Sequence, residues 1–213
     1  MQNSKFPLIL GLVLATLLGV IASKMGLFTK DSSMLQSSVK QMQTSTLLNP
    51  PKVVPDFNLV NHHGKDFSKE SLLGKHSILF FGFVNCPDIC PQSLQFLKSV
   101  KFQLQQAEVW PDFQVVFISV DPARDTVDVI SKYVPYFDQE FIGVTGSVEA
   151  IEAFTKALAM PFSFSEKDEN GYYEVDHSAS LLLTNPQGDI QAIISQPHTL
   201  DQITTDLLTI VSR

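Results

Sequence analysis

The strongest constraint on the fold is an apolar run that leads directly into a closely spaced pair of cysteines. Residues 77–84 read SILFFGFV, which is the length of a strand and predicts a β-strand buried on both faces. Residues 85–91 (NCPDICP) follow, and from Pro91 apolar residues recur at helical spacing. A strand, a turn and a helix in this order place both sulfur atoms near the amino end of the helix.

The remaining pattern predicts an α/β fold. A short hairpin with Gly64 at its turn is expected before the apolar run. Further strands and extended pieces are expected at 115–120, 141–144, 172–175, 180–184 and 189–194, and helices at 127–134, 147–158 and 199–211. A mostly parallel start, closed by an antiparallel hairpin and a terminal helix, is the order of a thioredoxin-like domain.

The amino-terminal segment predicts a membrane anchor. Phe6 to Ser23 contains no charged residue and lies between Lys5 and Lys24. As a helix it would be about 27 Å long, enough to cross a hydrocarbon core. The best candidate for a signal-peptidase site, Val20-Ile21-Ala22, is a poor match, so an uncleaved transmembrane helix within residues 1–28 is preferred.

The segment after the anchor predicts a tether, followed by one domain. Residues 29–54 are rich in Ser, Thr and Gln and end near Pro50-Pro51, so we expect a flexible linker there and a folded domain over 55–213. The chain has a formal charge of −7, and its amino-terminal part is basic, so the domain is acidic. An acidic domain argues against nucleic acid as a partner.

Both cysteines of the chain, Cys86 and Cys90, lie one helical turn apart. A helix amino terminus lowers a thiol pKa, so we expect a reactive pair rather than a structural disulfide, which would close too small a loop to stabilise much. Redox chemistry and metal binding both stay open. The spacing departs from the Cys-x-x-Cys redox motif, and Phe83 stands where a peroxiredoxin has Thr or Ser.

The metal-binding hypothesis needs a third ligand, and the chain contains five histidines. We expect His62 and His63 in an exposed turn, and His76 and His198 in loops. His177 follows one extended piece and precedes the apolar strand whose mouth faces the cysteine turn. Two thiolates with one imidazole form a soft, low-coordinate set that favours copper, especially Cu(I), whereas structural zinc takes four ligands.

Three segments together resemble the Sco/SenC family: Phe81-Gly82-Phe83 before CPDICP, residues 120–126 (VDPARDT), and Val175-Asp176-His177. The resemblance implies a membrane-anchored thioredoxin-fold protein that binds one copper ion, Cu(I) or Cu(II), through Cys86, Cys90 and His177. Many members carry Thr-His before the first cysteine, where this chain has Val84-Asn85. This departure removes an auxiliary imidazole and would affect redox tuning more than binding.

The function implied by the resemblance is a copper chaperone for the binuclear copper centre of cytochrome c oxidase subunit II, a metallochaperone rather than an enzyme. Its partners would be that subunit, the membrane, and an upstream copper donor or thiol reductant. The domain would face the periplasm or an equivalent compartment from the inner membrane. The alternative is a thiol–disulfide reductase in which Cys86 and Cys90 alone are the redox-active pair; a copper or redox sensor is the third reading.

Five charged residues near these motifs have open roles. Asp125 or Thr126 is expected to cap the helix that follows, and Arg124 is expected to pair with an acid. Loop positioning or partner docking is the alternative for Asp121, Arg124 and Asp125. Asp88 and Asp176 lie beside the proposed ligands. They could orient an imidazole or simply be solvated.

Overall fold

The computed structural model describes residues 42–212. The apolar stretch expected to be an anchor, and the first part of the expected linker, lie outside these residues. Within residues 42–212, no helix has both the length and the apolar character that a membrane crossing requires.

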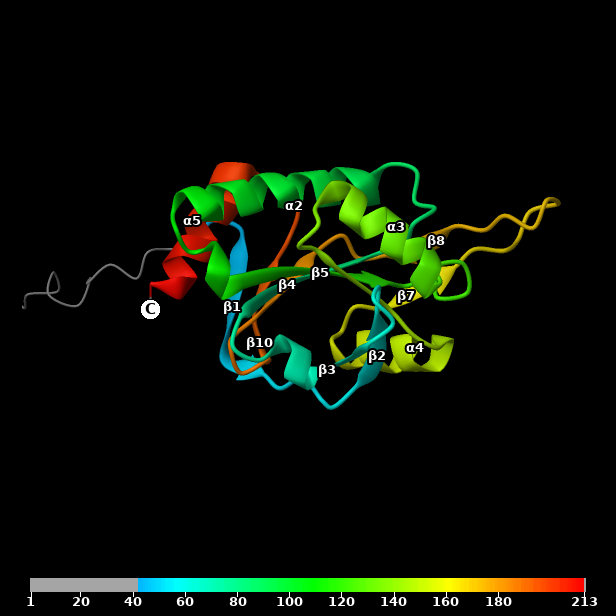
Figure 1. Ribbon diagram of the computed structural model, residues 1–213, viewed down its shortest axis with the longest axis horizontal. Helices are drawn as coiled ribbons and strands as arrows, with labels where there is room; N and C mark the ends of the chain where they lie inside the picture. Colours follow the sequence, from blue (N-terminus) through cyan, green and yellow to red (C-terminus); the bar gives the residue numbers. More distant parts are fainter. Residues whose placement is uncertain (1–41, 213) are drawn as a thin grey trace, which may run out of the picture. The chain divides into compact units, whose positions relative to one another are not determined.

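An eight-stranded mixed sheet forms the centre of the domain (Figure 1). The central strands β4, β5 and β6 are parallel, and the strands on both flanks are antiparallel. From edge to edge the order is β1 (Ser45–Lys52), β10 (Ile190–Ile194), β9 (Leu181–Thr184), β4 (His76–Gly82), β5 (Phe113–Ser119), β6 (Ile142–Thr145), β2 (Asn58–Asn61) and β3 (Asp66–Ser68). The predicted α/β class is therefore confirmed.

The apolar runs occupy the middle of this sheet. Every residue of β4 is buried, and in β5 all but Gln114 are. Helices α2 (Ile89–Gln106), α3 (Val127–Phe137) and α5 (Leu200–Val211) cover one face, and α4 (Val148–Ala157) covers the other (Figure 1). Short 3₁₀ turns lie at Lys69–Leu72 and Trp110–Asp112. A strand covered on both faces needs an uninterrupted apolar sequence, which is what β4 and β5 have.

Local sequence signals start two of the helices as expected. The Thr126 hydroxyl accepts a hydrogen bond from the amide of Val129 at the start of α3, and the Ser147 hydroxyl accepts one from Ala150 at the start of α4. Each cap satisfies an amide that has no partner within its helix. The predicted capping by Thr126 is confirmed.

The predicted linker boundary at residue 54 is wrong, because β1 belongs to the sheet and pairs with β10. The buried carboxylate of Asp206 in α5 accepts hydrogen bonds from three successive amides, those of Gln43, Thr44 and Ser45, at 2.8, 2.9 and 2.9 Å. The polar, proline-containing sequence suits an edge strand, where one side of the backbone needs no partner. Composition alone therefore made this strand look like a tether.

A second, two-stranded sheet consists of β7 (Phe162–Phe164) and β8 (Val175–His177), paired antiparallel. The chain between the two strands extends away from the domain body (Figure 1). The sequence predicted an extended piece at 172–175 but not its partner β7. His177, the proposed third ligand, therefore lies on a hairpin outside the main sheet.

Candidate metal centre

The two cysteines occupy the connection from the central strand to the first helix. Cys86 is half-buried in the loop after β4, and Cys90 is buried in the first turn of α2. The amide of Cys90 points at the sulfur of Cys86, with an N···S distance of 3.4 Å. Neither is in a disulfide. As expected, the strand, turn and helix bring both sulfur atoms to the amino end of the helix.

Gly82, the last residue of β4, leaves room for the second sulfur atom. A Cβ at this position would lie 2.8 Å from Cys90 Sγ and 3.0 Å from the ring of Phe117. Real Cβ atoms do not approach neighbours that closely, so any other residue would push the sulfur or the ring away. The glycine in the Phe81-Gly82-Phe83 segment therefore sets how deep Cys90 lies.

His177 presents one ring nitrogen to the cysteines. Its Nε2 lies 3.7 Å from Cys90 Sγ, while its Nδ1 is 3.1 Å from the carbonyl oxygen of Ser178. A carbonyl only accepts, so Nδ1 carries the proton and Nε2 keeps a free lone pair directed at the sulfur atoms. The ring of Phe83 packs against the imidazole at right angles, with centroids 5.8 Å apart.

The structure thus brings the three residues singled out in the sequence to one point. One potential ligand atom from each of Cys86, Cys90 and His177 lies within 4.8 Å of the other two. Asp88 and Asp176 line the pocket in front of the cluster without being part of it. The carboxylate of Asp88 accepts a hydrogen bond from the side chain of Gln92.

Burial disfavours the charged forms of Cys90 and His177. It raises the pKa of the Cys90 thiol, and it lowers the pKa of His177. The expected lowering of the thiol pKa by the helix terminus is therefore wrong for Cys90, because desolvation of the thiolate outweighs the helix field. A neutral imidazole and two thiols form a set that a soft cation can bind by displacing the thiol protons.

The other histidines lie elsewhere. His62 was expected to be exposed, but it is buried, and its Nδ1 accepts a hydrogen bond from the amide of Gly143 at 2.9 Å. His76 is a buried member of β4 rather than a loop residue, and His198 stacks on Phe96. Among the described residues, the only cluster suited to a metal ion contains His177.

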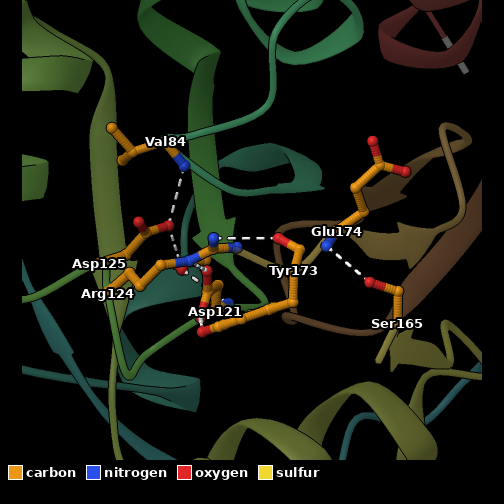
Figure 2. Close-up of polar contacts among 8 residues, drawn as sticks. Val84, Asp121, Arg124, Asp125, Ser165, Tyr173 and Glu174 are labelled. Atoms are coloured by element: carbon orange, nitrogen blue, oxygen red, sulfur yellow. Dashed lines mark hydrogen bonds and ion pairs between the residues drawn. The ribbon is translucent and has the colours of Figure 1, made fainter. Parts of the chain in front are cut away.

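Residues 121–126 connect β5 to α3 beside the cysteine loop (Figure 2). Arg124 pairs with an acid, as predicted, and the structure identifies that acid as Asp121. Two further contacts were not predicted: Arg124 Nη1 donates to the carbonyl of Tyr173, and Asp125 accepts from the amide of Val84. They join segments far apart in sequence, and no local signal indicates such a pairing.

The domain is similar to one family along almost all of its described length. The SCO1/SenC family matches residues 45–212. A Stutzerimonas stutzeri protein named for copper binding is 41% identical over 75% of this chain and 78% of its own length. The mitochondrial SCO2 homologue of Bos taurus is 37% identical over 78% of this chain and 62% of its own, so this chain spans less than two thirds of that relative.

The chain is also similar in structure to solved members of the Sco family. Arabidopsis thaliana ScoI with copper bound is 34% identical, with a TM-score of 0.70, and the match covers 76% of this chain and all of that one. BsSco, a member of the Sco family of cytochrome c oxidase assembly proteins in which a disulfide switch is identified, is 25% identical with a TM-score of 0.61 over 78% of this chain and 96% of its own. The thioredoxin-like arrangement expected from the order of elements is confirmed.

Proposed function

We propose, from the premise that this chain belongs to the SCO1/SenC family, that it is a copper-binding protein of cytochrome c oxidase assembly. The observation that carries the proposal is the convergence of Cys86, Cys90 and His177 within 4.8 Å. Two sulfur ligands and one neutral imidazole match the preference of Cu(I) for soft donors and low coordination numbers.

The residues around the centre determine how copper is held and released. Cys90 is the buried ligand, while the half-buried Cys86 and His177 both line the pocket in front of it. A thiolate of a target protein can therefore reach the ion beside Cys86 and replace the site's ligands one at a time. Ligand exchange of this kind never leaves the ion without thiolate coordination.

The target is subunit II of cytochrome c oxidase, the apolar stretch Phe6–Ser23 is the membrane anchor, and the domain faces the periplasm or an equivalent space. The net charge of the chain, −7, suits a target with a basic docking face. An upstream copper donor or a thiol reductant prepares the site for loading.

A second candidate function, thiol–disulfide reduction, is favoured by the unequal exposure of the two cysteines. The half-exposed Cys86 attacks a disulfide in the target as a thiolate, forming a mixed disulfide and releasing one target thiolate. Cys90 then attacks the Cys86 sulfur, which releases the second target thiolate and leaves a Cys86–Cys90 disulfide. Two electrons pass to the target, and a separate reductant must restore the pair.

Copper titration of the full chain in mild detergent separates the two functions. We expect one Cu(I) per reduced chain, lost in Cys86→Ser and Cys90→Ser, and bound much more weakly by His177→Ala. His198→Ala is the matched control, because His198 contacts Phe96 and Ile194 rather than the cysteines. Absence of copper binding by the wild type, with disulfide reduction that His177→Ala does not change, would leave only the reductase.

A further inference from the structure

The hairpin that carries His177 has little backbone support of its own. Strands β7 and β8 pair with each other and with no strand of the main sheet. A two-stranded ribbon is marginally stable by itself in water. The distance of His177 from the cysteines therefore depends on side-chain contacts between the hairpin and the domain body.

Alternation along the hairpin identifies the residues that make those contacts. Tyr173, Val175 and His177 lie on one side of the extended chain and are at least partly buried, while Glu174 and Asp176 are exposed. Just before β8, the amide of Glu174 donates to the hydroxyl of Ser165 at 2.9 Å (Figure 2). The amide of Ser165 in turn donates to the carbonyl of Glu174 at 3.0 Å. Tyr173 is thus part of the ordered hairpin, about 13 Å along the strand from His177.

Tyr173 is held at three points by the loop between β5 and α3 (Figure 2). Its hydroxyl donates to the fully buried carboxylate of Asp121 at 2.7 Å. Its carbonyl accepts from Arg124 Nη1 at 3.1 Å, and its ring lies 3.7 Å from the guanidinium carbon. Arg124 Nε pairs with the second oxygen of the same Asp121 carboxylate, so the group closes on itself.

The next residue in the loop holds the cysteine segment. The buried Asp125 accepts hydrogen bonds from the amide of Val84 at 2.9 Å and from the hydroxyl of Ser119 at 2.7 Å. Val84 lies two residues before Cys86 in the same loop. The ring of Phe83 lies near both Arg124 and His177. Its centroid is 5.7 Å from the guanidinium carbon of Arg124 and 5.8 Å from the centroid of the His177 imidazole.

We propose that Asp121, Arg124 and Tyr173 are positioning residues that hold His177 over the cysteine pair, while Asp125 holds the cysteine loop from the same turn. None of the four is a metal ligand. The proposal rests on the proposed function, because it assigns these residues to the copper centre. Removing a partner outside the first coordination shell typically lowers metal affinity by about 10- to 100-fold, and that is the loss we expect.

We call the contacts among Asp121, Arg124 and Tyr173 the clamp. A double-mutant cycle tests whether the clamp affects copper binding through His177. Arg124→Lys keeps the charge but loses the planar fork, and Tyr173→Phe loses only the hydroxyl bond to Asp121. Cu(I) affinity of the full chain in detergent is measured by competition with a chromophoric Cu(I) chelator. We expect a loss of about 10- to 100-fold for Arg124→Lys and a smaller one for Tyr173→Phe. In a His177→Ala background, both changes should have no further effect.

Lys132→Ala is the matched control, since Lys132 pairs with Asp128 on the exposed side of the helix after this loop. It should leave copper affinity unchanged. An equal loss for Arg124→Lys with and without His177 would show a general structural effect and overturn the proposal, as would no loss in either background.

A metal-free readout keeps this inference separate from the proposed function. Hydrogen exchange of the amides in residues 172–178 should be faster in Arg124→Lys and unchanged in Lys132→Ala. If Arg124→Lys exchanges faster but the wild type binds no copper, the clamp is supported and the proposed copper function is contradicted. Unchanged exchange in Arg124→Lys would contradict the clamp whatever the copper result.

Discussion

The two halves of the copper centre differ in how they are built. The cysteine half lies between the fully buried β4 and the start of α2, so the core of the domain fixes it. The histidine half lies on a hairpin that pairs with no strand of the main sheet. Side chains from the loop of residues 121–126 connect the two. The cysteine half therefore depends on core packing, and the histidine half depends on a few polar contacts.

The largest expected effects come from the cysteines themselves. Cys86→Ser and Cys90→Ser should each abolish stoichiometric copper binding, because one thiolate and one imidazole do not hold Cu(I) tightly. Only Cys90→Ser should also lower the free energy of unfolding, by about 1–3 kcal/mol, since it buries a hydroxyl where a thiol packs. Copper analysis and chemical denaturation of both variants check this. Equal stabilities would contradict the difference between the buried Cys90 and the half-buried Cys86.

The next effect is a pH dependence centred on Asp125. Desolvation, with a smaller contribution from the charge of Asp121, raises the pKa of this carboxyl to about 6. The hydrogen bonds from Ser119 and Val84 and the charge of Arg124 oppose that rise. The native state therefore holds this proton more tightly than the unfolded state. Stability from this group is present below about pH 4 and is lost as the pH rises through about 6.

Asp125→Asn, which is neutral at every pH, provides the comparison for this titration. Relative to this variant, the wild type should lose about 2 kcal/mol of unfolding free energy between pH 4 and 7. Denaturation curves of the two proteins at several pH values measure the difference. A difference in unfolding free energy between the two proteins that stays constant from pH 4 to 7 would mean that Asp125 is ionised throughout this range.

Overpacking beside the deep sulfur should be next in size. Gly82→Ala should lower the free energy of unfolding by about 1–3 kcal/mol and also weaken copper binding, because the new Cβ displaces Cys90 Sγ or Phe117. Gly143→Ala is the matched control, since its Cβ would meet Ile130 and Val134 instead. It should destabilise the fold without changing copper affinity in the folded protein. A copper defect of equal size in both variants would contradict the local account.

The smallest effect is expected for the exposed carboxylate next to the histidine. Asp176 points away from the buried side of the hairpin, so Asp176→Asn should change copper affinity by less than about 3-fold, the scale of a solvent-screened charge. Competition titration at two salt concentrations measures it. A loss of 10-fold or more would place Asp176 among the residues that orient His177 and would revise the division between the two halves.

The same division explains what the sequence could predict. Strand β4, the turn and α2 are consecutive, and each has a local signal: apolar length, proline and helical spacing. The caps at Thr126 and Ser147 are likewise local. His177 was found as a candidate because it precedes an apolar strand, and the structure places its Nε2 3.7 Å from Cys90 Sγ.

The features that sequence reasoning missed depend on contacts across long sequence separations. β1 looks like a linker until Asp206 and β10 satisfy its backbone. The bond between Tyr173 and Asp121 has no spacing rule to indicate it. The pKa of Cys90 rises because tertiary packing buries the thiol, which the helix position alone does not show.

X-ray absorption of the Cu(I)-loaded full chain identifies the atoms that coordinate the copper ion. We expect two sulfur scatterers and one imidazole nitrogen for the wild type, with the nitrogen contribution lost in His177→Ala and retained in His198→Ala. A sulfur-only coordination shell that His177→Ala leaves unchanged would contradict the assignment of Cys86, Cys90 and His177 as one copper centre.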